Sequence, residues 1–141
     1  MSNYSETFRG VVYPWHCDHQ GHMNIMHYVG FFDQSYWHLF SMMGFTRAYL
    51  DEQRKGFVGV KDTFTYSAEQ GPGSTIIIES CLTKIGSSSV VSYAVMKNSE
   101  TGETAANWEN VGVYFDLENR TKSAFNDVER SWMEKHVEEL V

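Results

Sequence analysis

The chain has 141 residues, of which 42% are hydrophobic and 15% aromatic, and its formal net charge is −7, from 11 Lys and Arg against 18 Asp and Glu. This length suits one domain, 1–141, with its own hydrophobic core. The acidic balance argues against a nucleic-acid partner, which usually selects a basic face. The sequence shows neither a membrane-spanning segment nor a signal peptide, and the spacing of Cys17 and Cys81 suggests neither a disulfide framework nor a zinc site. A cytoplasmic protein is therefore expected.

The predicted elements begin with a strand over residues 7–16, followed by a glycine-containing loop. Residues 24–43 then predict one long helix, because apolar side chains recur at helical spacing. Asn24 can cap its start, and Gly44 follows its end. Further aromatic residues widen the apolar stripe beyond one face, so burial of this helix on most sides is expected.

The pattern then changes to that of strands. Alternating apolar residues predict four strands, over residues 57–68, 74–85, 89–98 and 103–117. In the first of these, Asp62 shares the predicted inward face with Val58, Val60, Phe64 and Tyr66, although a bulge would change that face. Asn126 and Glu129 form a predicted capping box for a short C-terminal helix. This order indicates an α+β fold, with an antiparallel sheet of about five strands wrapped around one long central helix.

The loop between the first strand and the helix carries the most informative chemistry. It reads His16-Cys17-Asp18-His19-Gln20-Gly21-His22-Met23-Asn24. This order places the carboxylate of Asp18 beside a helix N-terminus, whose free N–H groups can stabilise a developing negative charge. Such an arrangement suits acyl-transfer chemistry.

Over roughly residues 8–118, the chain resembles the hotdog-fold acyl-CoA thioesterases of the 4-hydroxybenzoyl-CoA thioesterase-like family. The most specific match runs from Cys17 to Asn24, with Tyr28 four residues on: an aspartate, two variable residues, a glycine, a His-x-Asn and then a tyrosine. Residues 85–89 and 101–105 are weaker matches. His16 departs from the family, many members of which have an acidic residue at this position.

The resemblance implies hydrolysis of an acyl-CoA thioester in a hotdog fold, with neither a metal ion nor a cofactor. Asp18 would act as nucleophile or general base, and backbone N–H groups near Ile25 would form the oxyanion hole. His22 would position water or the thioester carbonyl, or pack in the loop, while Asn24 serves mainly as a cap. The resemblance also implies a homodimer with the site at its interface, and a homotetramer built as a dimer of dimers.

Aromatic residues suggest the nature of the acyl pocket. Rings along the chain would suit an aryl acyl group or, through cation–π contacts, a quaternary-ammonium group similar to betaine; a short aliphatic group is the third option. The predicted substrate-binding residues are Trp15, Tyr28, Trp37, Asp62, Tyr66 and Ser88. Asp62 could reach the pocket from a neighbouring subunit.

Several alternatives remain open at this point. Cys17 beside histidines could form a Cys-His nucleophile, and His16, His22 and His27 with Asp18 could imitate a metal site. At the level of function, the alternatives are a hotdog dehydratase acting on 3-hydroxyacyl thioesters and a non-catalytic acyl-CoA-binding module.

Overall fold

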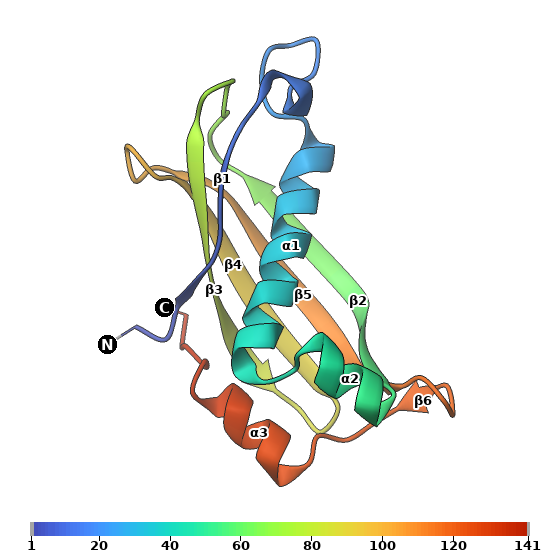
Figure 1. Cartoon of the computed structure of the whole chain (residues 1–141). Coiled ribbons are helices and arrows are strands. Elements are labelled where there is room, and N and C mark those ends of the chain that lie inside the picture. The colour runs from blue at the N-terminus through green and yellow to red at the C-terminus, as the bar shows by residue number, and fades with distance from the viewer. Residues whose placement is uncertain (1, 141) are drawn as a thin grey trace.

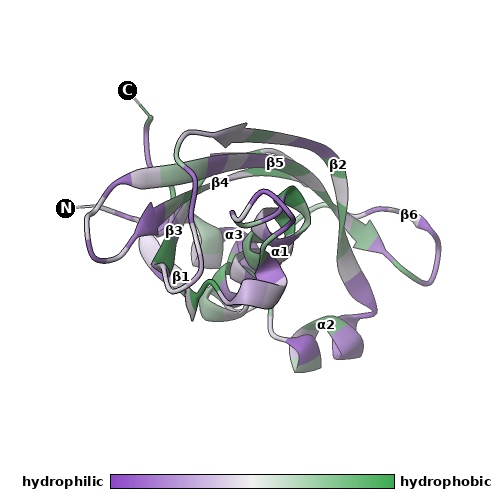
Figure 2. Cartoon of the chain, turned by 90° about the horizontal axis from the view of Figure 1, so that it is seen from above, coloured by the Kyte–Doolittle hydropathy of each residue, from purple (hydrophilic) through white to green (hydrophobic). Residues whose placement is uncertain are grey.

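Five long antiparallel strands form one curled sheet in the order β1-β3-β4-β5-β2, and α1 lies against its concave face (Figures 1 and 2). The computed structural model describes residues 2–140. The strands are β1 (Ser5–Val11), β2 (Lys55–Tyr66), β3 (Thr75–Ile85), β4 (Ser89–Asn98), β5 (Thr104–Asp116) and the two-residue β6 (Thr121–Lys122). The helices are α1 (Ile25–Met43), α2 (Arg47–Gln53), α3 (Asp127–Glu134) and the 3-10 turn η1 (Pro14–His16). The predicted hotdog architecture is confirmed.

The ends of α1 are set by the residues that the sequence indicated. The Asn24 side chain accepts a hydrogen bond from the Met26 N–H, as an N-cap does. Gly44 ends the helix with φ +131°, and a Cβ there would lie 2.7 Å from the Trp132 ring. Only glycine meets both the backbone conformation and the close contact at this position.

The core lies between the sheet-facing side of α1 and the concave face of the sheet. Phe32, Leu39 and Phe40 of α1 are buried almost completely, as are Ile78 and Met96 of the sheet. The side chains alternate along the strands, so that every second residue of β4 and of the second half of β5 is buried. The sheet and the helix therefore need each other to remove their apolar faces from water.

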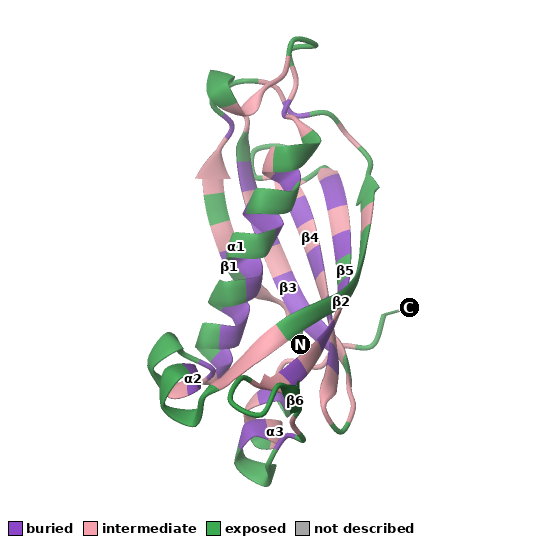
Figure 3. Cartoon of the chain, turned by 90° about the vertical axis from the view of Figure 1, so that its right-hand side faces the viewer, coloured by how far each residue is buried: buried purple, intermediate pink, exposed green. Residues whose placement is uncertain are grey.

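The expectation that α1 is buried on most sides is wrong for the single chain. The sheet covers only one side of the helix, and the opposite side is exposed along its length (Figure 3). Ile25 is 60% exposed, Met26 66% and Trp37 45%. The wide apolar stripe in the sequence thus serves two surfaces, the core and a face that this chain leaves open.

The predicted face of β2 is wrong in its first half because the strand contains a bulge. Its pairing with β5 shifts register between Gly59 and Lys61. A bulge places two residues opposite one and reverses the alternation beyond it. Val58 and Val60 are consequently exposed, although Phe64 packs against Phe32 of α1.

The structure differs from the sequence-based expectation in the first strand and in α2, and agrees with it in α3. The first strand ends at Val11 rather than at residue 16, because Pro14 begins a 3-10 turn. Helix α2 was not predicted. The capping box of α3 is confirmed: the Asn126 side chain accepts from the Glu129 N–H, and the Glu129 carboxylate accepts from the Asn126 N–H.

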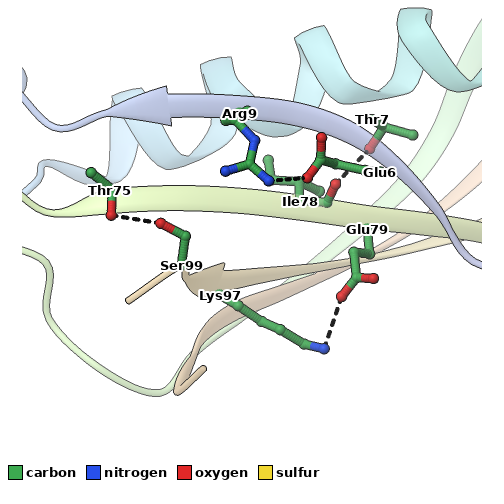
Figure 4. Close-up of polar contacts among 8 residues, drawn as sticks. All are labelled: Glu6, Thr7, Arg9, Thr75, Ile78, Glu79, Lys97 and Ser99. Carbon is green, nitrogen blue, oxygen red and sulfur yellow. Dashed lines mark hydrogen bonds and ion pairs between the residues drawn. The ribbon is translucent and has the colours of Figure 1, made fainter. Parts of the chain in front are cut away.

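Polar contacts link neighbouring strands of the sheet (Figure 4). The Thr7 hydroxyl of β1 donates to the Ile78 carbonyl oxygen of β3 at 3.2 Å. Lys97 of β4 donates to Glu79 of β3 at 2.8 Å. Within residues 2–140, none of the helices combines the length and apolar character needed to cross a membrane.

Candidate active site

The loop between β1 and α1 is closed by its own backbone. The Asp18 N–H donates to the His22 carbonyl oxygen at 3.1 Å, and the Gly21 N–H donates to the Asp18 carbonyl oxygen at 3.0 Å. Gly21 has φ +86°, which a glycine adopts without strain. The loop is anchored further by the Asn24 N–H, which donates to the His16 carbonyl oxygen at 2.9 Å. These bonds fix Asp18 close to the first turn of α1.

Both carboxylate oxygens of Asp18 accept hydrogen bonds. Oδ1 accepts from the Gln20 N–H at 2.9 Å, and Oδ2 accepts from the Asn24 Nδ2 at 3.2 Å. Asn24 therefore has two functions, because its Oδ1 caps the helix while its Nδ2 orients Asp18. A reactive carboxylate held by two donors is preorganised rather than free to rotate.

One free donor remains at the start of α1. The first four N–H groups of a helix have no intrahelical partner. Here the Met26 N–H donates to the Asn24 side chain, and the His27 and Tyr28 N–H groups donate to the Asn24 carbonyl oxygen. Within the described chain, the Ile25 N–H has no hydrogen-bond partner, so it is available to a developing oxyanion.

Asp18 and Ile25 line the same pocket, which has a volume of about 420 Å³. Its other walls come from the loop, from the first turn of α1 and from the end of β2, and they include His22, Tyr28 and Tyr66. The Tyr28 and Tyr66 rings meet edge to face, with centroids 5.2 Å apart. Burial raises the pKa of both tyrosines, so their hydroxyl groups stay protonated at neutral pH.

The structure also brings residues 68–70 to this loop, and the sequence analysis did not select them; Ala68 and Glu69 line the pocket. Glu69 follows β2 and pairs with His22, with 3.2 Å between Oε2 and Nε2. The Tyr28 hydroxyl donates to the Ala68 carbonyl oxygen at 3.3 Å. The Gln70 carbonyl oxygen accepts from the Met23 N–H. Residues 68–70 carry no local motif, and only the folding of β2 against the loop brings them to Asp18.

Four predicted site residues lie elsewhere in the single chain. Trp15 is exposed in η1 and stacks on Tyr13, with ring centroids 4.5 Å apart. Trp37 and Asp62 line a different pocket, halfway along α1. Ser88 lies in the turn between β3 and β4, where its carbonyl oxygen accepts from a β5 N–H.

The neighbouring histidines and Cys17 have structural partners. His16 Nδ1 accepts from the Tyr13 N–H at 3.0 Å, and the His16 ring meets those of His27 and Phe31 edge to face. Burial, and then the nearby His27, lowers the pKa of His16. The Cys17 thiol points to the Tyr13 carbonyl oxygen at 3.7 Å. Within residues 2–140, no group of three or more His, Cys, Asp or Glu side chains is arranged to hold a metal ion.

Two basic residues near strand ends, which could bind a phosphate group of a ligand, form ion pairs with carboxylates in this structure. Lys97 pairs with Glu79 and Arg54 with Glu118, at 2.8 Å and 3.1 Å. Both pairs are partly or largely exposed, so a competing phosphate could displace the carboxylate at small energetic cost.

Comparisons with known proteins concern the family and the fold of the chain. A family model described as the thioesterase-like superfamily matches residues 12–133. No curated protein sequence matches the chain.

Solved structures show the same fold. A hypothetical protein from Staphylococcus aureus, solved in complex with CoA, aligns with a TM-score of 0.88 at 14% identity, covering 100% of this chain and 90% of that one. YbaW Probable Thioesterase from Escherichia coli aligns with a TM-score of 0.79 at 20% identity, covering 93% of this chain and 98% of that one. A 1,4-dihydroxy-2-naphthoyl-CoA thioesterase from Synechocystis aligns with a TM-score of 0.78 at 12% identity, covering 89% of this chain and 93% of that one. At these identities the likeness concerns the fold.

Proposed function

The chain belongs to the thioesterase-like superfamily, so thioester hydrolysis is its general activity, and we propose that its substrate is an acyl-CoA. The products would be the free acid and coenzyme A. The observation that carries this proposal is the position of Asp18, which is hydrogen-bonded to the N-cap of α1 and shares a pocket with Ile25, whose N–H has no partner in the described chain.

Asp18 supplies the attacking oxygen by one of two routes. As a nucleophile, it attacks the thioester carbon, the C–S bond breaks, and coenzyme A leaves as a thiolate; water then hydrolyses the mixed anhydride. As a general base, it takes a proton from the water that attacks the same carbon. After turnover in ¹⁸O-labelled water, label found in the Asp18 carboxylate by peptide mass spectrometry would establish the nucleophilic route, because only the anhydride exposes that carboxyl carbon to attack by water.

The Ile25 N–H stabilises the negative charge on the thioester oxygen in both routes. Because the donor is a backbone group, the side chain at position 25 is not critical. His22 lines the same pocket and can orient water or the carbonyl group, with Glu69 as its partner.

The acyl group is aromatic, short or quaternary-ammonium in this proposal. The pair of Tyr28 and Tyr66 in the Asp18 pocket supports a small or ring-shaped group. A panel of acetyl-CoA, benzoyl-CoA and trimethylammonioacetyl-CoA, with released thiol measured by dithiobis(nitrobenzoate), tests the function. Tight binding of these esters without thiol release would instead support the non-catalytic module, and release of water from a 3-hydroxyacyl-CoA would support the dehydratase.

A homodimer, and from it a homotetramer, is the proposed assembly. β2 is an edge strand with Val58 and Val60 exposed, and the open side of α1 exposes Ile25, Met26 and Trp37. Edge strands and contiguous exposed apolar residues mark association surfaces. A second copy that pairs along β2 and covers the open side of α1 would place the Asp18 site at the interface. An active monomer in light scattering would contradict this assembly.

We also propose a reducing, cytoplasmic setting for the protein. Its support is that Cys17 and Cys81 are both free thiols in the structure.

A further inference from the structure

A second pocket, here called the Asp62 pocket, lies between α1 and the sheet with a volume of about 300 Å³. Its walls carry carboxylates, aromatic rings and one buried amide. The residues that matter for its chemistry are Asp33, Tyr36, Asp62, Phe64, Trp108 and Asn110. Within the described chain, no Lys, Arg or His lines it.

The carboxylate of Asp62 is held rigidly at the wall. Its Oδ1 accepts from the Trp108 Nε1 at 2.9 Å and from the Asn110 Nδ2 at 2.8 Å. In residues 2–140, Oδ2 has neither a hydrogen-bond donor nor an ion-pair partner. Asp62 is exposed, and its carboxylate is therefore fixed in place without a cationic partner in the described chain.

Asn110 adds an acceptor without a partner. The residue is 5% exposed, and its Oδ1 is buried with no hydrogen-bond partner in the part of the chain described. A Cβ built on Gly112 would lie 3.2 Å from this oxygen and 3.2 Å from the Tyr36 hydroxyl. Native proteins rarely leave such an acceptor unpaired, so its partner is a donor outside the described chain, either a water molecule or a group of a ligand.

Aromatic rings complete the walls. Phe64 and Trp108 stack with an interplanar angle of 2° and centroids 5.7 Å apart, and Tyr36 lies 5.8 Å from Trp108. Burial, and then the negative charges of Asp62 and Asp33, raises the pKa of Tyr36. The pocket thus combines aromatic rings, two carboxylates and an unpaired carbonyl oxygen.

We propose that the Asp62 pocket binds a cationic nitrogen and, resting on the proposed thioesterase function, that the acyl group of the substrate carries this nitrogen. A neutral acyl group would remove water from two carboxylates without compensating their charge, and an anionic one would be repelled. A cation gains from the carboxylates and from the ring faces together. The Asn110 oxygen can accept from an N–H group, or more weakly from the polarised C–H groups of a quaternary nitrogen.

The position of the pocket fits the proposed dimer. Asp33 is eight residues beyond Ile25, about 12 Å along α1, so a short acyl group cannot span both pockets of one chain. Val29 and Trp37 line the Asp62 pocket and also belong to the exposed face of the helix. A second copy on this face would bring its own Asp18 loop to the pocket.

A set of three thioesters of nearly equal shape tests the proposal. Trimethylammonioacetyl-CoA and dimethylammonioacetyl-CoA carry a positive nitrogen, whereas 3,3-dimethylbutanoyl-CoA has a neutral carbon at the same position. We expect kcat/KM, divided by each ester's rate constant for uncatalysed hydrolysis at the same pH, to be about tenfold or more higher for the better cationic ester than for the neutral ester. A ratio near one, or a preference for the neutral ester, would overturn the proposal. The order of the two cationic esters identifies the kind of nitrogen.

Variants test whether the preference for cationic thioesters arises in the Asp62 pocket. Asp62→Asn keeps an acceptor for Trp108 and removes the charge, while Asp33→Asn removes the second carboxylate, so the ratio of cationic to neutral kcat/KM, each divided by the uncatalysed rate constant, should fall toward one in both. The matched control is Glu109→Gln, because Glu109 is exposed on the same strand as Asn110. A ratio that stays unchanged in Asp62→Asn and Asp33→Asn would assign the preference to another site.

Direct binding separates this proposal from the proposed function. Tetramethylammonium chloride should change the tryptophan fluorescence at constant ionic strength, because Trp37 and Trp108 line the pocket, with NaCl as the reference salt. Asp62→Asn should weaken this change. If no thioester is hydrolysed but this Asp62-dependent binding is present, the function fails and the cation pocket stands. If thioesters are hydrolysed without cation preference or binding, the pocket proposal fails and the function stands.

Discussion

Replacement of Asp18 by Asn is the most direct perturbation of the site. The amide can neither attack a thioester nor take a proton from water, so the chemical step loses its attacking group. Groups in this role contribute about 10²–10⁴-fold to the rate. We expect kcat to fall about 10³-fold, which corresponds to about 4 kcal/mol of activation free energy.

The fold should survive the same change. The oxygen of the new amide can still accept from the Gln20 N–H, but its NH₂ group faces the donor Nδ2 of Asn24, so one partly buried hydrogen bond is lost. That loss is worth about 1 kcal/mol, or about 4 °C in Tm for a domain of this size.

The assay follows thiol release from the best thioester of the panel, with thermal unfolding measured on the same samples. Asp51→Asn is the control, since the only partner of the Asp51 side chain within residues 2–140 is Arg47, in an exposed pair on α2. If folded Asp18→Asn retained activity within tenfold of the unmodified protein while Asp51→Asn behaved the same way, Asp18 would not be the attacking or proton-accepting group.

Three further perturbations test the surroundings of the site and the core. Asn24→Ala removes both the N-cap and the donor to Asp18, so it should lower the unfolding free energy by about 1 kcal/mol and also reduce kcat. A loss of stability with kcat unchanged would show that Asn24 does not position Asp18. Glu129→Ala leaves two tyrosine hydroxyls without their buried acceptor, and a loss of about 3 kcal/mol is expected in urea unfolding; a change below about 1 kcal/mol would show that the network contributes little. Burial raises the pKa of Cys81 to about 11, so dithiobis(nitrobenzoate) at pH 8 should titrate only Cys17 in the native protein and both thiols in denaturant. Because the unfolded thiol loses its proton near pH 8.5, the contribution of Cys81 to stability should fall as pH rises from about 9 to 11, and unfolding of the Cys81→Ala variant should lack this component.

Local sequence patterns were sufficient for most elements and for the central residue of the site. The apolar repeat of α1 with Asn24 and Gly44 at its ends and the capping box of α3 act over a few residues, so each could be recognised without knowing what lies opposite. The same holds for Asp18 and its helix N-terminus, because they are neighbours along the chain.

Contacts between distant segments decided the rest. The bulge in β2 follows from its pairing with β5, and it turned Val58 and Val60 outward against the alternation in the sequence. The sequence determined that α1 is apolar on more than one face, but only the tertiary structure showed that the sheet covers one face and leaves the other open. The physical reason is that periodicity and capping arise within a segment, whereas burial, register and the convergence of Asp62, Trp108 and Asn110 depend on which segments pack together.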